Sequence, residues 1–340
     1  MGARSSVTIR DVARRADVSI SSVSRVLNES SGVSPEIRHR VQAAIDELGY
    51  LPYKSAQILK KKRTGVIGAV IPDVSNPFFS KMVRGMAKAA RDADFSVLIC
   101  DTENRAEIER NHLDVLIQEQ VEGVLLTTAE RHNTALDQLQ ERGIPTVAAD
   151  RRIDDAAIPT VCTDGVADAR MLTDYLVELG YGKFAFLAGP DPVSTARERR
   201  RGFVQTAERL GIDATVLDSP DAGYTFESGY NAAQALLNGA SPLPEVVIAA
   251  NDLMALGAMR ALDEQGHAIP ADIGVAGFDG IPLSGWVRPC LTTVEIPAFE
   301  LGREAMALLL HAVDRGPTAV DSSAPMPTRL VPGESTRRQP

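Results

Sequence analysis

From residue 64 onward, short apolar runs alternate with amphipathic stretches, and this alternation constrains the fold more than any other feature. The strand-like runs are 66–71, 95–100, 122–127, 146–149, 184–188, 246–250 and 273–278. The helical stretches lie near 79–92, 106–120, 134–142, 166–179, 196–210, 226–238 and 252–265. Strands that alternate with helices form parallel sheets with crossover helices. Because 64–340 exceeds one typical domain, we predict an α/β core of two doubly wound parallel-sheet lobes.

Polar and aromatic side chains follow the predicted strands. In open parallel sheets, ligands bind beyond the carboxyl ends of the strands. Carboxylates and amides bond hydroxyl groups, and aromatic rings stack on sugar faces, so these residue types suit a polyhydroxylated ligand. The candidate ligand-binding residues are Phe78, Phe79, Thr127, Asp150, Arg151, Arg199, Tyr224, Asn251, Asp279 and Trp286. For any one aspartate or asparagine, capping of the following helix is the competing and more common role.

Charge is divided unevenly along the chain. Residues 1–63 contain 12 Lys and Arg against 6 Asp and Glu, whereas residues 64–340 contain 24 against 39. The net charge of −9 therefore hides a basic head on an acidic body. A basic head of this kind is typical of a segment that meets nucleic acid or another acidic surface.

Several classes of protein find no support in the sequence. The three cysteines lack the close spacing of zinc or redox pairs, the five histidines are scattered, and no catalytic signature is present. We therefore expect no catalytic residues, no metal and no cofactor. No apolar run reaches the roughly 18 residues of a membrane span, and the N-terminus lacks the apolar core of a signal peptide. These observations predict a cytoplasmic protein without a membrane partner.

Capping patterns predict the first and third helices of the head. Thr8 followed by Asp11 is such a pattern, and apolar residues at helical spacing place the first helix at about 9–16. Ser34 with the proline after it begins another helix, which ends before Gly49. Apolar residues of this last helix are expected to pack on the other two.

The second helix of the head has an unusually small and polar exposed side. Asp17 can adopt the left-handed conformation of a tight turn, and Ser19 can cap a helix that begins at Ile20. Positions 21, 22 and 24 are serines, and Arg25 follows them. Short side chains let a helix approach the major groove closely, while arginine can bridge guanine. The pattern predicts a recognition helix, and a protein-binding three-helix module is the alternative.

An ordered set of motifs makes the head recognisable. These motifs are Val7-Thr-Ile-Arg-Asp-Val-Ala13, Val18-Ser19, Val23-Ser-Arg-Val-Leu-Asn28, Val33-Ser34 and Leu48-Gly-Tyr-Leu-Pro52. They resemble the helix-turn-helix headpiece of the LacI/GalR family of bacterial transcription regulators, with Asp17 where the family usually has glycine. Within the head, the expected DNA contacts are Thr8, Ser19, Ile20, Ser21, Ser22, Ser24, Arg25, Asn28 and Tyr50.

Residues 51–63 join the head to the body. A solvated linker is the simpler interpretation of so basic a run. The family resemblance instead implies a hinge helix that forms in the minor groove of DNA. Leu59 would be the apolar wedge between base steps, Lys60 would follow it, and Ala56 would allow close approach.

The resemblance continues through the body. It is carried by Ile71-Pro-Asp-Val-Ser-Asn-Pro-Phe-Phe79, Arg201-Gly-Phe203, Glu227-Ser-Gly-Tyr230, Ala250-Asn-Asp-Leu-Met-Ala-Leu-Gly257, Val275-Ala-Gly-Phe-Asp279 and Leu291-Thr-Thr-Val294. These motifs resemble the family's effector core, which is itself similar to periplasmic sugar-binding proteins. By this likeness the family's effector contacts fall on Asp150, Arg151, Arg199, Asn251 and Asp279. The aromatic stacking position falls on Tyr224, and Phe78 and Phe79 come from the first lobe.

The resemblance also implies the domain organisation. A headpiece of 1–50 and a hinge of 51–63 would precede the core of 64–340. The chain would pass between the lobes three times, with lobe 1 at about 64–164 and 295–320 and lobe 2 at about 166–291 and 321–335.

The function implied by the family is regulation of transcription. We expect a homodimeric repressor that binds near-palindromic operator DNA and responds to a small-molecule effector, a sugar or sugar derivative, between the lobes. Regulators of the same family that respond to a nucleobase, a nucleoside or a partner protein are the alternatives. A non-enzymatic sugar-binding protein would explain the body but not the head.

Overall fold

The computed structural model describes residues 7–27, 32–50, 63–127, 134–153, 158–218, 223–239, 242–316 and 321–337. The chain divides into two compact units, Met1–Thr64 and Gly65–Pro340. We call them the head and the core, and describe each by itself.

Three helices form the described part of the head. They are α1 (Ile9–Ala16), α2 (Ile20–Leu27) and α3 (Pro35–Leu48), so the predicted helices are confirmed. Asp17 has a φ of 52° and makes the left-handed turn between α1 and α2. All three helices contribute apolar side chains to one small core, which includes Val12, Val23 and Val41.

The helix ends of the head follow local chemistry. The carboxylate of Asp11 accepts hydrogen bonds from the amide of Thr8 at 2.9 Å and from its hydroxyl at 2.6 Å, so the two residues fix the start of α1. Ser34 Oγ accepts a bond from the amide of Ile37, and α3 ends at Gly49 with a φ of 60°. These contacts explain why such short helices begin and end where they do.

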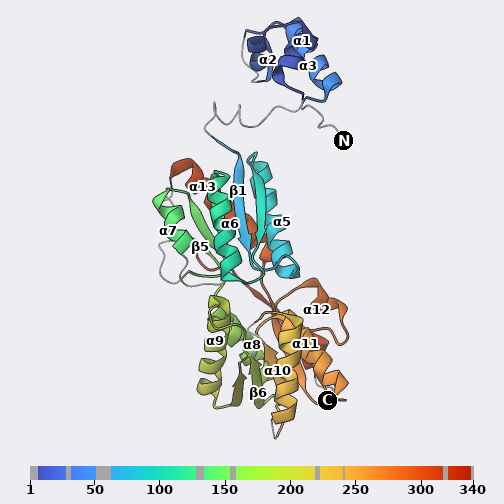
Figure 1. The fold of residues 1–340 in the computed structure, drawn as a ribbon. Coiled ribbons are helices and arrows are strands. Elements are labelled where there is room, and N and C mark those ends of the chain that lie inside the picture. Colours follow the sequence, from blue (N-terminus) through green and yellow to red (C-terminus); the bar gives the residue numbers. More distant parts are fainter. Residues whose placement is uncertain are drawn as a thin grey trace. The chain divides into compact units, whose positions relative to one another are not determined.

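The first lobe of the core, lobe 1, is built on a five-stranded parallel sheet in the order β2-β1-β3-β4-β5. Its strands are β1 (Val66–Ile71), β2 (Ser96–Asp101), β3 (Gly123–Leu126), β4 (Thr146–Ala149) and β5 (Thr160–Val161). Helices cover both faces of this sheet (Figure 1), namely α5 (Pro77–Asp92), α6 (Ala106–Gln118), α7 (Thr134–Glu141) and α13 (Ala298–Arg315).

Successive strand residues of lobe 1 point to opposite faces of the sheet. Ile67, Ala69 and Leu125 pack in one cluster with side chains of α5 and α13. Their neighbours Val70 and Leu126 belong to a second cluster that includes side chains of α6 and α7. Both faces are therefore buried, which is why the central strands read as continuous apolar runs.

The second lobe, lobe 2, has a six-stranded sheet in the order β11-β10-β9-β8-β6-β7, parallel except for β11. The strands are β6 (Lys183–Leu187), β7 (Asp213–Leu217), β8 (Val246–Ala249), β9 (Gly274–Asp279), β10 (Thr292–Glu295) and β11 (Arg329–Val331). The helices are α8 (Gly165–Glu178), α9 (Ser194–Leu210), α10 (Phe226–Gly239), α11 (Asp252–Glu264) and the short α12 (Pro282–Trp286), with a 3-10 turn, η2, at Glu334–Thr336. In Figure 1, α8 and α9 lie on one side of this sheet, and α10 and α11 lie on the other.

The chain passes between the lobes three times. It leaves lobe 1 after β5, returns after β10 and crosses again between α13 and β11. Neighbouring passages are hydrogen-bonded to each other, since the amides of Ser323 and Met326 donate to the carbonyls of Thr160 and Cys162. The lobes are thus joined by three chain segments, and the first and third are hydrogen-bonded to each other.

Four strands of the core, β5, β7, β10 and β11, were not among the seven predicted strands. β5 has only two residues, and β7 is an edge strand that begins with exposed Asp213, so neither shows a strong apolar pattern. The seven predicted strands are confirmed with ends shifted by one residue at most. Among the described residues, no helix is long and apolar enough to cross a membrane.

Candidate functional site

One cavity lies where carboxyl ends of strands from both lobes come together. Its lining residues are Asn76, Phe78, Phe79, Asp150, Arg151, Thr195, Arg199, Tyr224, Asn251 and Asp279. Eight of these ten are residues that the sequence singled out for ligand binding. The cavity lies at the edge where open α/β sheets bind ligands.

Two adjacent rings form the lobe 1 wall of the cavity. Asn76 begins α5 because its Oδ1 accepts a hydrogen bond from the amide of Phe78 at 3.0 Å. The rings of Phe78 and Phe79 meet edge to face, with centroids 5.1 Å apart. The guanidinium of Arg151 lies 5.5 Å from the centre of the Phe79 ring. An apolar surface therefore faces the charged groups of the cavity.

Asp150 and Arg151 follow β4 and are both buried. The backbone of Asp150 is left-handed, with a φ of 66°, and its amide is bonded to the carbonyl of Val161 on β5. Burial raises the pKa of Asp150 to about 6, although Arg151 and Arg199 act in the opposite direction. An uncommon backbone conformation and a desolvated carboxylate at one position are typical of a functional site.

A buried ion pair from lobe 2 forms the opposite wall. Arg199 of α9 bonds Asp279 Oδ1 at 2.9 Å and the carbonyl of Ala250 at 2.6 Å. Its guanidinium also lies 4.8 Å from the ring centre of Phe278. Burial raises the pKa of Asp279 despite the arginine beside it. The Nε atom of Arg199 is buried without a hydrogen-bond partner among the described residues, so it can still donate a bond.

The remaining lining residues of lobe 2 are held by one another. The hydroxyl groups of Tyr224 and Thr195 lie 3.2 Å apart. Asn251 donates to the carbonyl of Tyr224 at 3.2 Å, and its Oδ1 accepts from the amide of Met254 at 2.9 Å. Asn251 therefore lines the cavity and also caps α11, so helix capping and ligand binding are compatible roles for this residue. A side chain at Gly189 would collide with the Tyr224 ring, because an added Cβ would lie 2.7 Å from it.

The charges of the cavity are balanced. Two carboxylates, Asp150 and Asp279, face two guanidinium groups, Arg151 and Arg199, and all four are buried. Carboxylates accept hydrogen bonds and guanidinium groups donate them, so a ligand with several hydroxyl groups finds both kinds of partner. Aromatic rings beside these groups suit the apolar faces of a sugar.

The second candidate surface is the exposed side of α2 in the head. Ile20 is 46% exposed, and Ser21 and Arg25 are exposed as well. Ser19 Oγ lies 2.7 Å from the hydroxyl of Ser21 and 2.9 Å from that of Ser22, and it also accepts from the amide of Ser22. These serines thus form a hydrogen-bonded cluster at the first turn of the helix. Ser24 is half-buried on the same helix.

Two other residues predicted to contact DNA have structural roles in the head. Thr8 is exposed, but its hydroxyl is bonded to Asp11 at the start of α1. Tyr50 is only 7% exposed and packs in the core of the head. The DNA contact predicted for Tyr50 stays a prediction, and its ring also supports the three helices.

Comparison with known proteins places the chain in a family. Residues 8–53 match the model for bacterial regulatory proteins of the lacI family, and residues 64–328 match the model for periplasmic binding proteins and the sugar-binding domain of the LacI family. The chain belongs to the LacI family. Its relatives include a ribose operon repressor of Halalkalibacterium halodurans, 38% identical over 97% of both chains. The transcriptional repressor CytR of Escherichia coli K12 is 35% identical over 98% of this chain and 97% of that protein.

Solved structures of LacI-family proteins share the fold. The Lac repressor dimer bound to operator and the anti-inducer ONPF aligns with a TM-score of 0.85 and 29% identity, over 98% of this chain and 99% of that one. A family regulator from Enterococcus faecium with bound ribose aligns with a TM-score of 0.71 and 27% identity, over 79% of this chain and 98% of that one. The predicted family and fold class are confirmed.

Two predicted effector contacts of this LacI-family chain do not line the cavity. Thr127 follows β3 and is buried, and its hydroxyl has no partner among the described residues. Trp286 ends the short helix α12, and its side chain is 73% exposed. The effector contact predicted for Trp286 stays a prediction. Four predicted DNA contacts lie outside the described residues, namely Asn28, Ala56, Leu59 and Lys60.

Sequence reasoning missed two of the lining residues, Asn76 and Thr195. A local signal for each was available. Asn76 begins the helix that carries Phe78, in the same Asn-Pro-Phe-Phe motif. Thr195 lies four residues before Arg199 on α9, and this spacing places both on one side of a helix.

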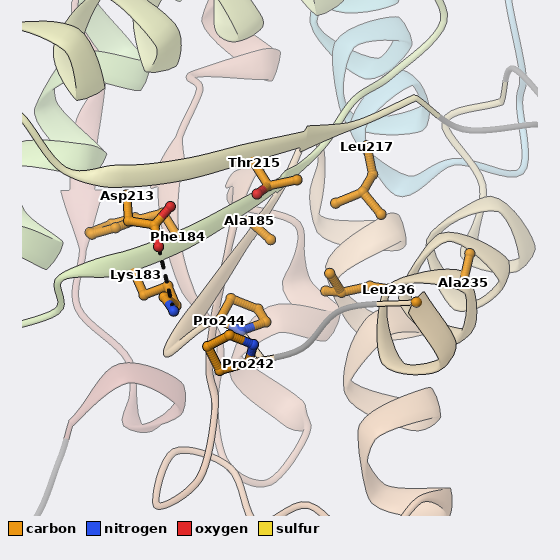
Figure 2. A pocket seen from close by; sticks show the side chains of 11 residues that line it. Lys183, Phe184, Ala185, Asp213, Thr215, Leu217, Ala235, Leu236, Pro242 and Pro244 are labelled. Carbon is orange, nitrogen blue, oxygen red and sulfur yellow. Dashed lines mark ion pairs between the residues drawn. The ribbon is translucent and has the colours of Figure 1, made fainter.

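A second pocket lies against β6 and the edge strand β7 of the lobe 2 sheet. Figure 2 shows its side chains, which come from β6, β7, the end of α10 and two prolines, Pro242 and Pro244. Lys183 and Asp213, the first residues of β6 and β7, form an ion pair of 3.4 Å there. The pocket extends along β7 from Asp213 to Leu217, and it shares no lining residue with the cavity between the lobes, so we do not assign the effector to it. Within the described residues, no cluster of three metal-ligating side chains occurs.

Proposed function

We propose that this chain is a sequence-specific DNA-binding repressor whose operator affinity is controlled by a small sugar bound between the lobes of the core. The observation that carries the proposal is the balanced set of buried charges, Asp150 and Arg151 from lobe 1 with Arg199 and Asp279 from lobe 2, in one cavity. A ligand that bonds all four holds the lobes together. The helix-turn-helix head supplies the means to read DNA.

The polar lining of the cavity and the named relatives favour a monosaccharide. The ribose operon repressor among the relatives and the family structure with bound ribose support an aldopentose such as D-ribose. A nucleoside is the second candidate, because Phe78, Phe79 and Tyr224 offer rings for stacking on a base.

In the head, we propose that α2 enters the major groove. Exposed Ser21 and Arg25 would contact base edges and phosphates, and Ile20 would add an apolar contact. Leu59, which lies outside the described residues, would wedge into the minor groove at the centre of the site. Head and hinge together would then select one sequence over others.

We also propose that the repressor is a homodimer. On β2, an edge strand of lobe 1, Leu98 is 40% exposed and Ile99 is 45% exposed, an apolar surface suited to a second copy of the chain. A related structure is a Lac repressor dimer on its operator. Two heads related by a two-fold axis would read the halves of a near-palindromic site.

The regulatory mechanism follows from the position of the cavity. A sugar that bonds residues of both lobes has a higher affinity for the closed core than for the open one, so it increases the closed population. Closure would change the relation between the lobe 1 surfaces of the dimer and hence the spacing of the hinges. We further propose that the protein acts in the cytoplasm and is not an enzyme.

Selection of bound duplexes from a random DNA pool, at about physiological salt, tests the proposed function, because non-specific phosphate binding is weak there. We expect enrichment of a near-palindrome with a flexible pyrimidine–purine step at its centre. The selection is repeated with a mixture of sugars and nucleosides. Failure to enrich any sequence under both conditions would contradict sequence-specific regulation.

A further inference from the structure

We infer that Arg152 and Glu198 form an interlobe latch, a contact that sets how readily the lobes close around the effector. The inference rests on the proposed function, because it concerns the same cavity. Arg152 Nε bonds Glu198 Oε1 at 3.1 Å. Arg152 belongs to lobe 1 and follows β4, whereas Glu198 belongs to α9 of lobe 2. A motion that opens the cavity would lengthen this contact.

Both latch residues are next in sequence to residues that line the cavity. Arg152 comes immediately after Asp150 and Arg151, and Glu198 comes immediately before Arg199. Neither latch residue lines the cavity itself. Arg152 and Glu198 are therefore positioning residues. They affect effector binding by fixing the backbone next to Arg151 and Arg199, which line the cavity.

The same glutamate also holds the first passage between the lobes. Glu198 Oε2 accepts a hydrogen bond from the amide of Gly165, the first residue of α8, at 3.3 Å. Glycine permits this approach, because an added Cβ at position 165 would lie 3.0 Å from both Cβ and Oε2 of Glu198. One carboxylate thus joins lobe 1, lobe 2 and the chain that connects them.

A backbone contact lies beside the ion pair. The amide of Arg152 donates to Ser194 Oγ at 2.8 Å, and Ser194 is the first residue of α9. Together the two bonds from Arg152 to α9 fix both the orientation of this helix relative to lobe 1 and its distance from lobe 1. The side chains of Arg152 and Glu198 are 41% and 18% exposed, so the ion pair is partly screened by water and its effect is modest.

Isothermal titration calorimetry with D-ribose tests the latch in the full-length protein. We expect Glu198→Gln and Arg152→Gln each to weaken ribose binding about two- to fivefold. The matched control is Arg200→Gln, since the bond of Arg200 to Asp218 lies within lobe 2. Unchanged affinity in both single variants, or an equal loss in the control, would overturn the latch.

Hydrogen exchange without any sugar separates the latch from the identity of the effector. In Glu198→Ala we expect faster amide exchange in peptides that contain residues 150–153 and 162–166, with a melting temperature close to that of the parent protein. Exchange as slow as in the parent protein would refute the latch. If the parent protein binds no ribose but the variant exchanges faster, the latch holds and the proposed effector is wrong.

Discussion

Arg199 donates a hydrogen bond to Asp279 over 2.9 Å, and both side chains are buried at the carboxyl ends of the lobe 2 strands. The same guanidinium bonds the carbonyl of Ala250. Burial of a charged pair costs desolvation energy, so such a pair is weak evidence of stability on its own. Its position in the cavity instead indicates that it holds polar groups ready for a ligand.

Replacing Arg199 with lysine should remove the effector response and spare DNA binding. Lysine keeps the charge but cannot bond Asp279 and the Ala250 carbonyl in the planar geometry of arginine. We expect D-ribose affinity to fall about 10- to 100-fold by calorimetry, with operator affinity unchanged. Arg200→Lys, on the same helix, is the control. A normal effector response in Arg199→Lys would show that the site is elsewhere.

The pH dependence of stability should report on Asp252. Burial raises the pKa of this carboxyl to about 7, even though it accepts bonds from Thr293, Ser284 and the amide of Ile281. Because the pKa of Asp252 is higher in the folded state, this carboxyl stabilises the fold fully below its unfolded-state pKa, about 4. The stabilisation is lost as the pH rises through the folded-state pKa, about 7.

Urea unfolding of the parent protein and of Asp252→Asn between pH 5 and 8 measures this contribution. The free energy of unfolding should fall less steeply with rising pH in the variant, because an amide does not ionise. Exposed Asp218 gives a control in Asp218→Asn. Parallel curves for Asp252→Asn and the parent protein would contradict the assignment.

Substitution on the β2 edge should separate the subunits. Leu98→Asp combined with Ile99→Asp places charges on an apolar surface, so the dimer should dissociate into monomers. Light scattering should then give half the mass of the parent protein. Operator binding should weaken along with dimerisation, since two heads bind one site. Leu210→Asp, an exposed leucine at the end of α9, is the control and should leave the mass unchanged. A double variant of unchanged mass would place the interface elsewhere.

Arg25→Ala tests base reading by α2. Loss of a bidentate contact to guanine should weaken binding to the selected operator about 10- to 100-fold and relax preference at one base pair of each half-site. The control is Arg15→Ala, whose side chain is paired with Glu47 on α3. Equal losses on operator and random DNA would mean that Arg25 contacts only phosphate.

Leu59→Ser tests the proposed hinge. Serine removes the apolar wedge, so operator affinity should fall while D-ribose affinity stays the same. Anisotropy with labelled operator and calorimetry with ribose give the two values. Operator affinity equal to that of the parent protein would eliminate the wedge.

Local chemistry made the head predictable from sequence. The Thr8 and Ser34 caps, the left-handed turn at Asp17 and the proline that begins α3 act over a few residues, and the helices begin and end as predicted. The burial of the Tyr50 ring was not predicted, because it depends on how three helices pack together, which local patterns do not report.

The core was predictable where both sheet faces are covered. Central strands such as β3 and β8 are apolar and buried throughout, whereas edge strand β7 begins with three exposed residues, 213–215, so it was missed. For the cavity, residue type and strand position identified most of the lining. The place of Trp286 depended on the direction of the short helix α12, and that direction is a tertiary property.

Titration of the selected operator with and without saturating D-ribose, followed by fluorescence anisotropy, tests the central claim most directly. The account predicts that ribose changes the operator dissociation constant by at least about fivefold, a typical size for coupling between sites. It also predicts that Arg199→Lys abolishes the change. Superimposable curves for the parent protein, while calorimetry shows that ribose saturates it, would contradict the claim that the cavity controls DNA binding.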